Sequence, residues 1–251
     1  MAIEGDRKTG LILLADHASN GLPAEYGSLG LPAAEFERHI AYDIGVEAVT
    51  RSLAAMLGCP ALMTRFSRLL IDPNRGADDP TLIMRLSDGA IIPGNARMGE
   101  DERARRIARF YRPYHDAIAN EVDQCLVDGS VPALVSVHSF TPFWKGTPRP
   151  WHVGILWERD HRFSDRLIAA FQAMGDLVVG DNEPYAGNLE GDTLYVHGLG
   201  RGLAHVLIEI RQDLIATQSG VDEWVERLSR AIKPVMKDPA LHRLPQARSS
   251  P

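Results

Sequence analysis

Short apolar runs alternate with segments of helical periodicity along most of this chain, and this alternation limits the possible folds. The clearest runs are residues 11–15 (LILLA), 133–137 (ALVSV) and 204–210 (AHVLIEI). Further strands are expected at 61–66, 69–71, 152–157 and 177–179, and helices at 32–57, 101–127, 165–174 and 221–235. Strands that alternate with helices predict a three-layer α/β sandwich with a central mixed, mainly parallel sheet.

The remaining segments suggest one domain with short ends. We expect a loose N-terminal lead over residues 1–10, a single domain over 11–237 and a flexible polar tail over 238–251. Residues 76–100 have no clear period and predict a long loop with short elements. The basic run 103–112 predicts a solvated helix face, and Pro113 should kink or split that helix.

Composition excludes several classes of protein. The 251 residues carry a formal net charge of −6, whereas a nucleic-acid-binding protein needs a concentrated positive surface. The two cysteines, Cys59 and Cys125, lie far apart, which suggests neither a disulfide framework nor a cysteine metal site. No apolar run approaches the length of a membrane span, and no signal peptide is recognisable. The expected location is therefore the cytoplasm, with no nucleic-acid or membrane partner.

Ionisable side chains lie at the ends of several predicted strands. These residues are Asp16, His17, Asp72, Asn74, Arg75 and His138, while Glu209 lies within the last apolar run. Ligands of open α/β sheets bind beyond the carboxyl ends of strands, so we expect these residues to converge. Glu209 is the hardest to explain structurally, because burying an unpaired carboxylate is costly.

Such a set could carry out metal-assisted hydrolysis. Two imidazoles and one carboxylate form the usual protein ligands of a hydrolytic zinc ion, with a further position for water. A separate carboxylate can transfer protons, and an arginine can hold a substrate carboxylate. No local pattern such as HExxH identifies the ligands, so spacing alone predicts the zinc site only weakly.

At these residues the chain resembles the N-formylglutamate amidohydrolases, from about residue 11 to 235. The resemblance rests on segments spread along the chain, which are LADHASNGLP (14–23), RHIAYDIGVEAV (38–49), SRLLIDPNR (67–75), YRPYHDAI (111–118), SVHSFTP (136–142), DNEPY (181–185) and HGLGRGLAHVLIEIRQDLI (197–215). The family is similar to zinc carboxypeptidases and aspartoacylases. The resemblance therefore implies a zinc-exopeptidase-like (phosphorylase/hydrolase-like) sandwich with about eight mixed strands.

The resemblance also implies roles for individual residues. His17 and His138 correspond to metal ligands of one zinc ion per chain, and Glu209 to the general acid and base. Asn74 and Arg75 correspond to the pair that binds the substrate carboxylate, and Arg68, Arg211 and His197 are further candidates for substrate contact. The carboxypeptidase pattern places Glu third after the first histidine, but this chain has Asn20 there, and a neutral amide is a poor zinc ligand. Asp43 is the expected replacement, although it could equally be a helix N-cap.

The expected substrate is a small N-acyl amino acid, such as N-formyl-L-glutamate. The same machinery would also suit a zinc carboxypeptidase or an amidase acting on cell-wall peptides. An alternative of another class is a non-catalytic protein that binds small carboxylates and keeps only the fold and the arginine clamp.

Overall fold

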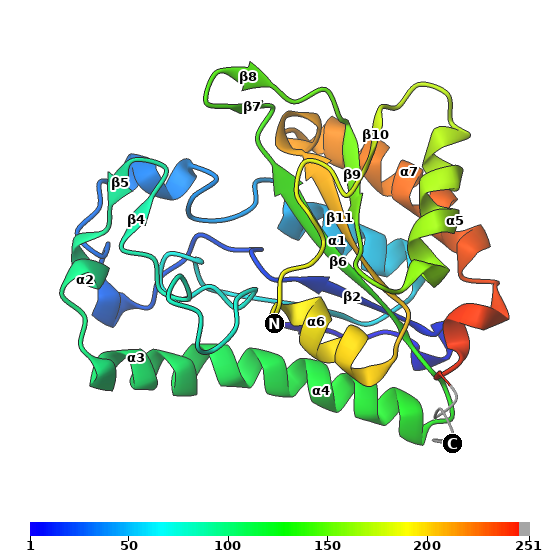
Figure 1. Ribbon diagram of the computed structural model, residues 1–251, viewed down its shortest axis with the longest axis horizontal. Coiled ribbons are helices and arrows are strands. Elements are labelled where there is room, and N and C mark those ends of the chain that lie inside the picture. Colours follow the sequence, from blue (N-terminus) through cyan, green and yellow to red (C-terminus); the bar gives the residue numbers. More distant parts are fainter. Residues whose placement is uncertain (246–251) are drawn as a thin grey trace.

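A seven-stranded mixed sheet forms the centre of the molecule (Figure 1). The computed structural model describes residues 1–245. The strand order is β1-β3-β2-β6-β11-β9-β10. The strands comprise β1 (Ala2–Ile3), β2 (Leu11–Ala15), β3 (Ala61–Met63), β6 (Ala133–Phe140), β9 (Val153–Leu156), β10 (Val179–Asp181) and β11 (His205–Arg211). The four strands β3, β2, β6 and β11 are mutually parallel, whereas β1 and the β9–β10 pair run in the opposite direction.

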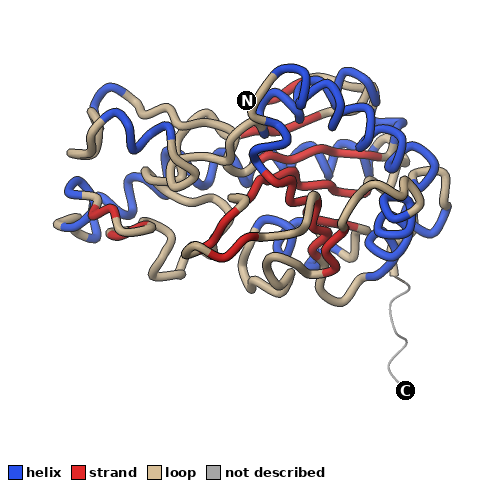
Figure 2. The backbone as a smooth tube through the Cα atoms, turned by 90° about the horizontal axis from the view of Figure 1, so that it is seen from above, coloured by secondary structure: helices blue, strands red, loops and turns tan. Residues whose placement is uncertain are grey.

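Helices cover both faces of this sheet (Figures 1 and 2). On one face lie α1 (Val46–Leu57), α5 (His161–Gln172) and α7 (Gln218–Val235), and on the other lie α4 (Arg112–Val127) and the short α6 (Thr193–His197). Each face of the sheet forms a hydrophobic core with the helices that cover it, and successive side chains of a strand point into opposite cores. Leu13 packs on the side of α1, α5 and α7, and Ile12 on the side of α4 and α6. The prediction of a three-layer sandwich with a mixed, mainly parallel sheet is therefore confirmed.

A smaller lobe of loops and short elements lies beside the sheet, at the left of Figure 1. It contains β4 (Leu86–Ser87), β5 (Ala90–Ile91), α2 (Pro93–Ala96) and α3 (Glu100–Arg106). Residues 69–71, which the sequence predicted as a strand, are instead turns and bends whose side chains are fully buried in this lobe. These side chains are as buried as those of a core strand, but among the described residues their backbone pairs with no strand.

Residues 1–10 are part of the fold, contrary to the expected loose lead. β1 pairs with β3 at the edge of the sheet, and Arg7 donates hydrogen bonds to Glu121 of α4. The expected tail is also ordered at its start, because Leu241 is fully buried in the core. Residues 246–251 of that predicted tail lie outside the described residues.

The predicted break near Pro113 takes the form of a π-helical turn, Ile107–Tyr111, between α3 and α4. Proline lacks an N–H group and cannot make the regular helical hydrogen bond, and the wider turn accommodates this loss. The basic face is less solvated than predicted. Arg106 is buried and donates to the carbonyl oxygen of Leu70 and to Asn95 Oδ1, so it joins the helix to the small lobe.

The remaining short elements complete the chain. A hairpin is formed by β7 (Phe143–Trp144) and β8 (Thr147–Pro148). 3₁₀ helices occupy Arg7–Thr9, Ala24–Tyr26, Ala33–Glu37, Leu199–Arg201, Gln212–Ile215 and Pro239–His242. Within the described part of the chain, no helix has the length and apolarity that crossing a membrane requires.

Candidate functional site

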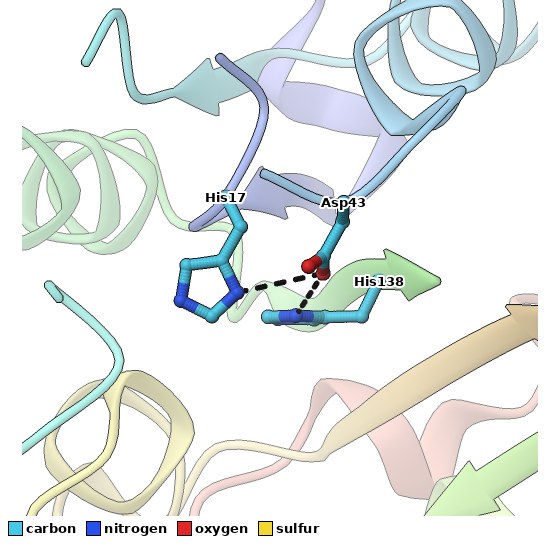
Figure 3. Close-up of side chains that lie close together, drawn as sticks. All are labelled: His17, Asp43 and His138. Atoms are coloured by element: carbon cyan, nitrogen blue, oxygen red, sulfur yellow. Dashed lines mark hydrogen bonds and ion pairs between the residues drawn. The ribbon is translucent and has the colours of Figure 1, made fainter. Parts of the chain in front are cut away.

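Three of the predicted site residues meet near the carboxyl ends of the central strands β2 and β6 (Figure 3). His17 follows β2, His138 lies in β6, and Asp43 lies in the loop that leads to α1. Their potential ligand atoms all lie within 4.8 Å of one another, and all three residues are buried. Asp43 is not the helix cap that the sequence allowed, because Gly45 occupies that position and the Asp43 carboxylate points toward the two imidazoles.

The carboxylate of Asp43 lies between the two rings. Its Oδ2 atom is 2.9 Å from His138 Nδ1 and 3.4 Å from His17 Nδ1. The ring centroids are 5.0 Å apart and the ring planes are nearly perpendicular. The three groups therefore face a common point from three different elements of the fold.

A second carboxylate orients each imidazole from behind. His17 Nε2 lies 2.7 Å from Asp72 Oδ1, and His138 Nε2 lies 3.0 Å from Asp16 Oδ2. A carboxylate only accepts hydrogen bonds, so each histidine donates its Nε2–H group. The Nδ1 atoms face Asp43: a protonated His138 Nδ1 donates to Asp43 Oδ2, and once that proton is lost both Nδ1 atoms can present lone pairs to a cation, as in carboxylate–histidine–metal arrangements.

Both outer carboxylates are themselves held by donors. Asp16 accepts from the Tyr114, Ser136 and Thr193 hydroxyl groups. Burial alone would raise the pKa of Asp16, but the hydrogen bond from His138 and the neighbouring imidazole charges keep it well below its usual range. Asp72, buried in the same way, is held by Arg68 and also has a lowered pKa.

The cluster fits a divalent cation. His17 Nδ1 is buried and has no hydrogen-bond partner among the described residues, which is costly unless another group meets it. Two imidazole nitrogens and one carboxylate oxygen match the donor set of a hydrolytic zinc site. With both imidazoles neutral, the carboxylates of Asp16, Asp43 and Asp72 outnumber the guanidinium groups of Arg68 and Arg75, so a cation can replace the protons that these carboxylates otherwise favour on the two histidines.

Glu209 lies beside this cluster. It pairs in register with His138 across β6 and β11, and its side chain lines the same cavity as His17, Asp43 and His138. Burial raises the pKa of Glu209 to about 7, and its Oε2 atom has no hydrogen-bond partner among residues 1–245. A carboxyl group with this pKa can both accept and donate a proton near neutrality.

The cavity in front of the cluster has a volume of about 430 Å³ and is lined by Arg68, Asn74 and Arg75 as well. Arg68 donates twice to Asp72, so its guanidinium is largely committed. Arg75 lies 4.0 Å from Asp72 and has no closer ion pair with a described residue. Asn74 Oδ1 accepts from the backbone N–H of Thr193, which leaves the amide NH₂ group available.

Two residues that the sequence suggested for substrate contact, Arg211 and His197, are not part of the lining of this cavity. Arg211 forms a two-point ion pair with Asp213, and His197, the last residue of α6, is hydrogen bonded to His115 of α4. His115 also hydrogen bonds to the carbonyl oxygen of Pro73.

Several residues of the site had no role predicted from the sequence. Asp16 appeared only as a polar strand-end residue, yet it orients His138. The aromatic residues Trp144, Trp157 and Tyr185 also line the cavity; Trp144 belongs to the short hairpin strand β7 and the other two lie outside helices and strands, so none follows a recognisable pattern. The hydroxyl groups that donate to Asp16 come from positions as far away as Thr193, so only the fold reveals them.

Two imidazoles and a carboxylate beside an unpaired glutamate are typical of metal-dependent hydrolases. The sequence profile of the N-formylglutamate amidohydrolases matches residues 9–216, and the chain belongs to this family. The resemblance seen in the sequence is thus confirmed.

Solved structures share the fold of this chain. A gene product from Agrobacterium tumefaciens is 34% identical, with a TM-score of 0.84 over 91% of this chain and 92% of that one. The N-formylglutamate amidohydrolase from Ralstonia eutropha JMP134 is 23% identical, with a TM-score of 0.66 over 90% of this chain and 92% of its own, a likeness of fold. Among curated protein sequences, none matches this chain.

Proposed function

We propose that this protein is a zinc-dependent amidohydrolase that cleaves the N-formyl, or a related N-acyl, amide of an acidic amino acid such as N-formyl-L-glutamate. The observation that carries the proposal is the buried cluster of His17, Asp43 and His138, with an unpartnered Nδ1 atom on His17 and Glu209 alongside. The family supports hydrolysis of an amide, and the likeness to the N-formylglutamate amidohydrolase from Ralstonia eutropha supports the formyl substrate.

His17 Nδ1, His138 Nδ1 and an Asp43 oxygen would hold one zinc ion per chain. When bound, zinc would supply Lewis-acid polarisation of a carbonyl oxygen and of a water molecule. Asp72 and Asp16 keep both imidazoles in the tautomer and orientation that the site needs.

Glu209 transfers the protons of the reaction. Its carboxylate takes one proton from the attacking water, whose oxygen forms the new bond to the acyl carbon. The carbon–nitrogen bond then breaks, and Glu209 gives the proton to the departing nitrogen. The OH group of the water thus ends on the acyl carbon of the acid, and its proton ends on the free amine. Burial raises the pKa of Glu209, which favours its holding the proton until the nitrogen departs.

Arg75 and Asn74 hold the carboxylate of the amino acid. A guanidinium can donate two parallel hydrogen bonds to a carboxylate, and the Asn74 amide adds a neutral donor. Both side chains line the cavity that Glu209 and the cluster share. Fixing the substrate at its carboxylate sets the amide at one place relative to Glu209, which lowers the entropic part of the barrier.

The deciding experiment combines metal analysis with formate release from N-formyl-L-glutamate. Protein purified without chelator should contain about one zinc per chain, lose activity on metal removal and regain it with zinc. Glu209→Gln should retain zinc and lose about 10²–10⁴-fold in kcat. Glu226→Gln, an exposed position on α7, is the matched control and should behave as the wild type.

Other outcomes would contradict the proposal in different ways. Zinc-dependent cleavage of peptides without formate release would favour a carboxypeptidase or a cell-wall peptide amidase. Absence of bound metal, together with no hydrolysis of any N-acyl amino acid after zinc addition, would favour a non-catalytic carboxylate-binding protein.

A further inference from the structure

The cavity extends well beyond the residues that the proposed reaction uses. His205, Leu207 and Glu209 alternate along β11, so they share one face of the strand, and all three line the cavity. From Glu209 to His205 the strand rises by about 13 Å, at about 3.3 Å per residue. The open space therefore continues along the sheet from the proton-transferring carboxylate to the start of β11.

Leucine side chains form the walls of this extension. We call it the leucine arm, defined by Leu156, Leu189, Leu194, Leu199 and Leu207, with His205 at its far end. Leu207 and Leu156 are neighbours in register on β11 and β9 and form the floor. Leu194 belongs to α6, and Leu199 to the 3₁₀ helix that follows it. The walls of the arm thus come from the sheet, from α6 with the turn after it, and from the loop before α6.

The loop that covers the arm is attached to β9 by close backbone contacts. A Cβ atom on Gly154 would lie 2.0 Å from the carbonyl oxygen of Glu183, and one on Gly187 would lie 2.4 Å from the backbone nitrogen of Trp157. The side-chain oxygen of Asn182 accepts from the N–H groups of both Trp157 and Gly187. Both glycines allow the loop to lie against the strand, so the arm has a fixed roof.

A formyl group, with one carbon and one oxygen, would leave this arm unused. The arginines that line the cavity also suit a substrate with one carboxylate better than a substrate with two. Of the two arginines in the described lining, Arg68 is already bonded to Asp72, and Arg75 is the less committed one. Apolar walls of this length are complementary to a chain of methylene groups.

We propose that the leucine arm binds an unbranched apolar chain of medium length attached next to the scissile amide. This inference rests on the proposed amidohydrolase function: a chain on the acyl group keeps the amino acid acidic, whereas a chain on the amino acid takes the place of its acidic side chain. The chain could belong to the acyl group or to the amino-acid side chain, since both leave the reacting amide within a few bonds.

Two substrate series test this proposal and distinguish the two sources of the chain. The first series keeps L-glutamate and lengthens the acyl group from formyl through acetyl, butyryl and hexanoyl to octanoyl. The second keeps the formyl group and varies the amino acid from glutamate through alanine and norvaline to norleucine and methionine. In the productive series kcat/KM of the zinc-loaded protein should rise about fourfold per buried methylene.

A blocking variant locates the effect in the arm. Leu199→Trp should lower the ratio of kcat/KM between the longest and the shortest substrate of the productive series by about tenfold or more. Leu177→Trp places the same change on a partly buried leucine outside the arm and should leave the ratio as in the wild type. Calorimetric titration of Glu209→Gln with the intact substrates gives a binding readout that is independent of turnover.

The outcomes separate the two proposals. Hydrolysis of N-formyl-L-glutamate that falls with every added carbon in both series would overturn the leucine-arm proposal and leave the amidohydrolase intact. Chain-length dependence that Leu199→Trp leaves unchanged, in a folded variant, would also overturn it. No hydrolysis and no binding in either series, with zinc present, would overturn the proposed function itself.

Discussion

Two pairs of buried histidines lie in this molecule with almost the same spacing but different surroundings. The rings of His17 and His138 are 5.0 Å apart, and those of His115 and His197 are 5.1 Å apart. Each ring of the first pair is bonded to a carboxylate through Nε2. The second pair is bonded to itself and to the backbone oxygen of Pro73.

This difference explains why only one pair is suited to a cation. In the first pair the outer carboxylates fix the Nε2–H groups and leave the Nδ1 atoms facing Asp43. In the second pair, His115 Nε2–H donates to Pro73 and His115 Nδ1 accepts from His197, so both His115 nitrogens are used. Carboxylate partners therefore separate a proposed metal site from a structural pair, although both are buried.

The largest expected effect follows from removing one histidine of each pair. His138→Ala should abolish stoichiometric zinc binding and hydrolysis, because a three-residue donor set loses one member. His197→Ala should retain about one zinc per chain, because His197 is not part of the cluster. Elemental analysis and the hydrolysis assay measure both. Loss of zinc in the folded His197→Ala protein would contradict the comparison.

A smaller effect is expected from the outer carboxylate of His17. Asp72→Ala should weaken zinc affinity by about 10–100-fold, because His17 loses the acceptor that orients it. Competition with a metal-binding dye would measure the change. Asp176→Ala, at an exposed aspartate paired with Arg227, is the control and should leave affinity unchanged. Equal affinities of the Asp72 variant and the wild type would show that His17 needs no orienting partner.

The second pair should appear in the pH dependence of stability. Burial and repulsion from His115, opposed by attraction from Asp16 and aided by a smaller repulsion from Arg201, lower the pKa of His197 from 6.5 to about 4. The unfolded chain therefore binds the proton more readily between these values. The contribution of neutral His197 is complete above pH 6.5 and is lost as the pH falls toward 4, by on the order of 2 kcal/mol.

Urea unfolding of metal-free protein between pH 7.5 and 4.5 would measure this loss. The variant His197→Leu should show a shallower fall in the free energy of unfolding than the wild type. His161→Gln, at an exposed histidine, serves as the control and should follow the wild-type curve. If His197→Leu and the wild type had parallel profiles, the second pair would not be held neutral by burial.

The smallest effect concerns the support behind His138. Tyr114→Phe removes one of three hydroxyl donors to Asp16 and should cost about 1 kcal/mol of stability, with little loss of zinc affinity. Thermal unfolding and the dye competition would measure the two quantities. A loss of zinc affinity as large as that of Asp72→Ala would mean that Tyr114 positions His138 itself.

The sequence predicted the layers of the fold and the position of the cluster well. Apolar runs and strand-end polar residues depend on local chemistry, so 11–15, 133–137 and 204–210 were recognised as strands. The resemblance then selected His17, His138 and Asp43, which the structure brings together. Their roles, and that of Glu209, stay predictions until the experiments above are done.

The features that escaped prediction depend on contacts between distant residues. Residues 69–71 are apolar enough for a strand, but they pack into the small lobe instead of pairing. Arg106 was placed on a solvated face because helical periodicity cannot register the acceptors that meet it from Leu70 and Asn95. The leucine arm combines β9, β11, α6 and an irregular loop, which no local pattern connects.

The π-helical turn between α3 and α4 determines which way two side chains of this helix point. Arg106 and Tyr111 are five residues apart, yet they reach the two ends of one segment, at the carbonyl oxygens of Leu70 and Arg75. A regular helix would rotate by about 100° per residue and bring the fourth residue, not the fifth, to that side. The extra residue thus works as a spacer: with one position deleted between Arg106 and Tyr111, a regular helix would keep both side chains on one side, whereas a regular helix of unchanged length would turn the Tyr111 hydroxyl away from the turn that presents Arg75.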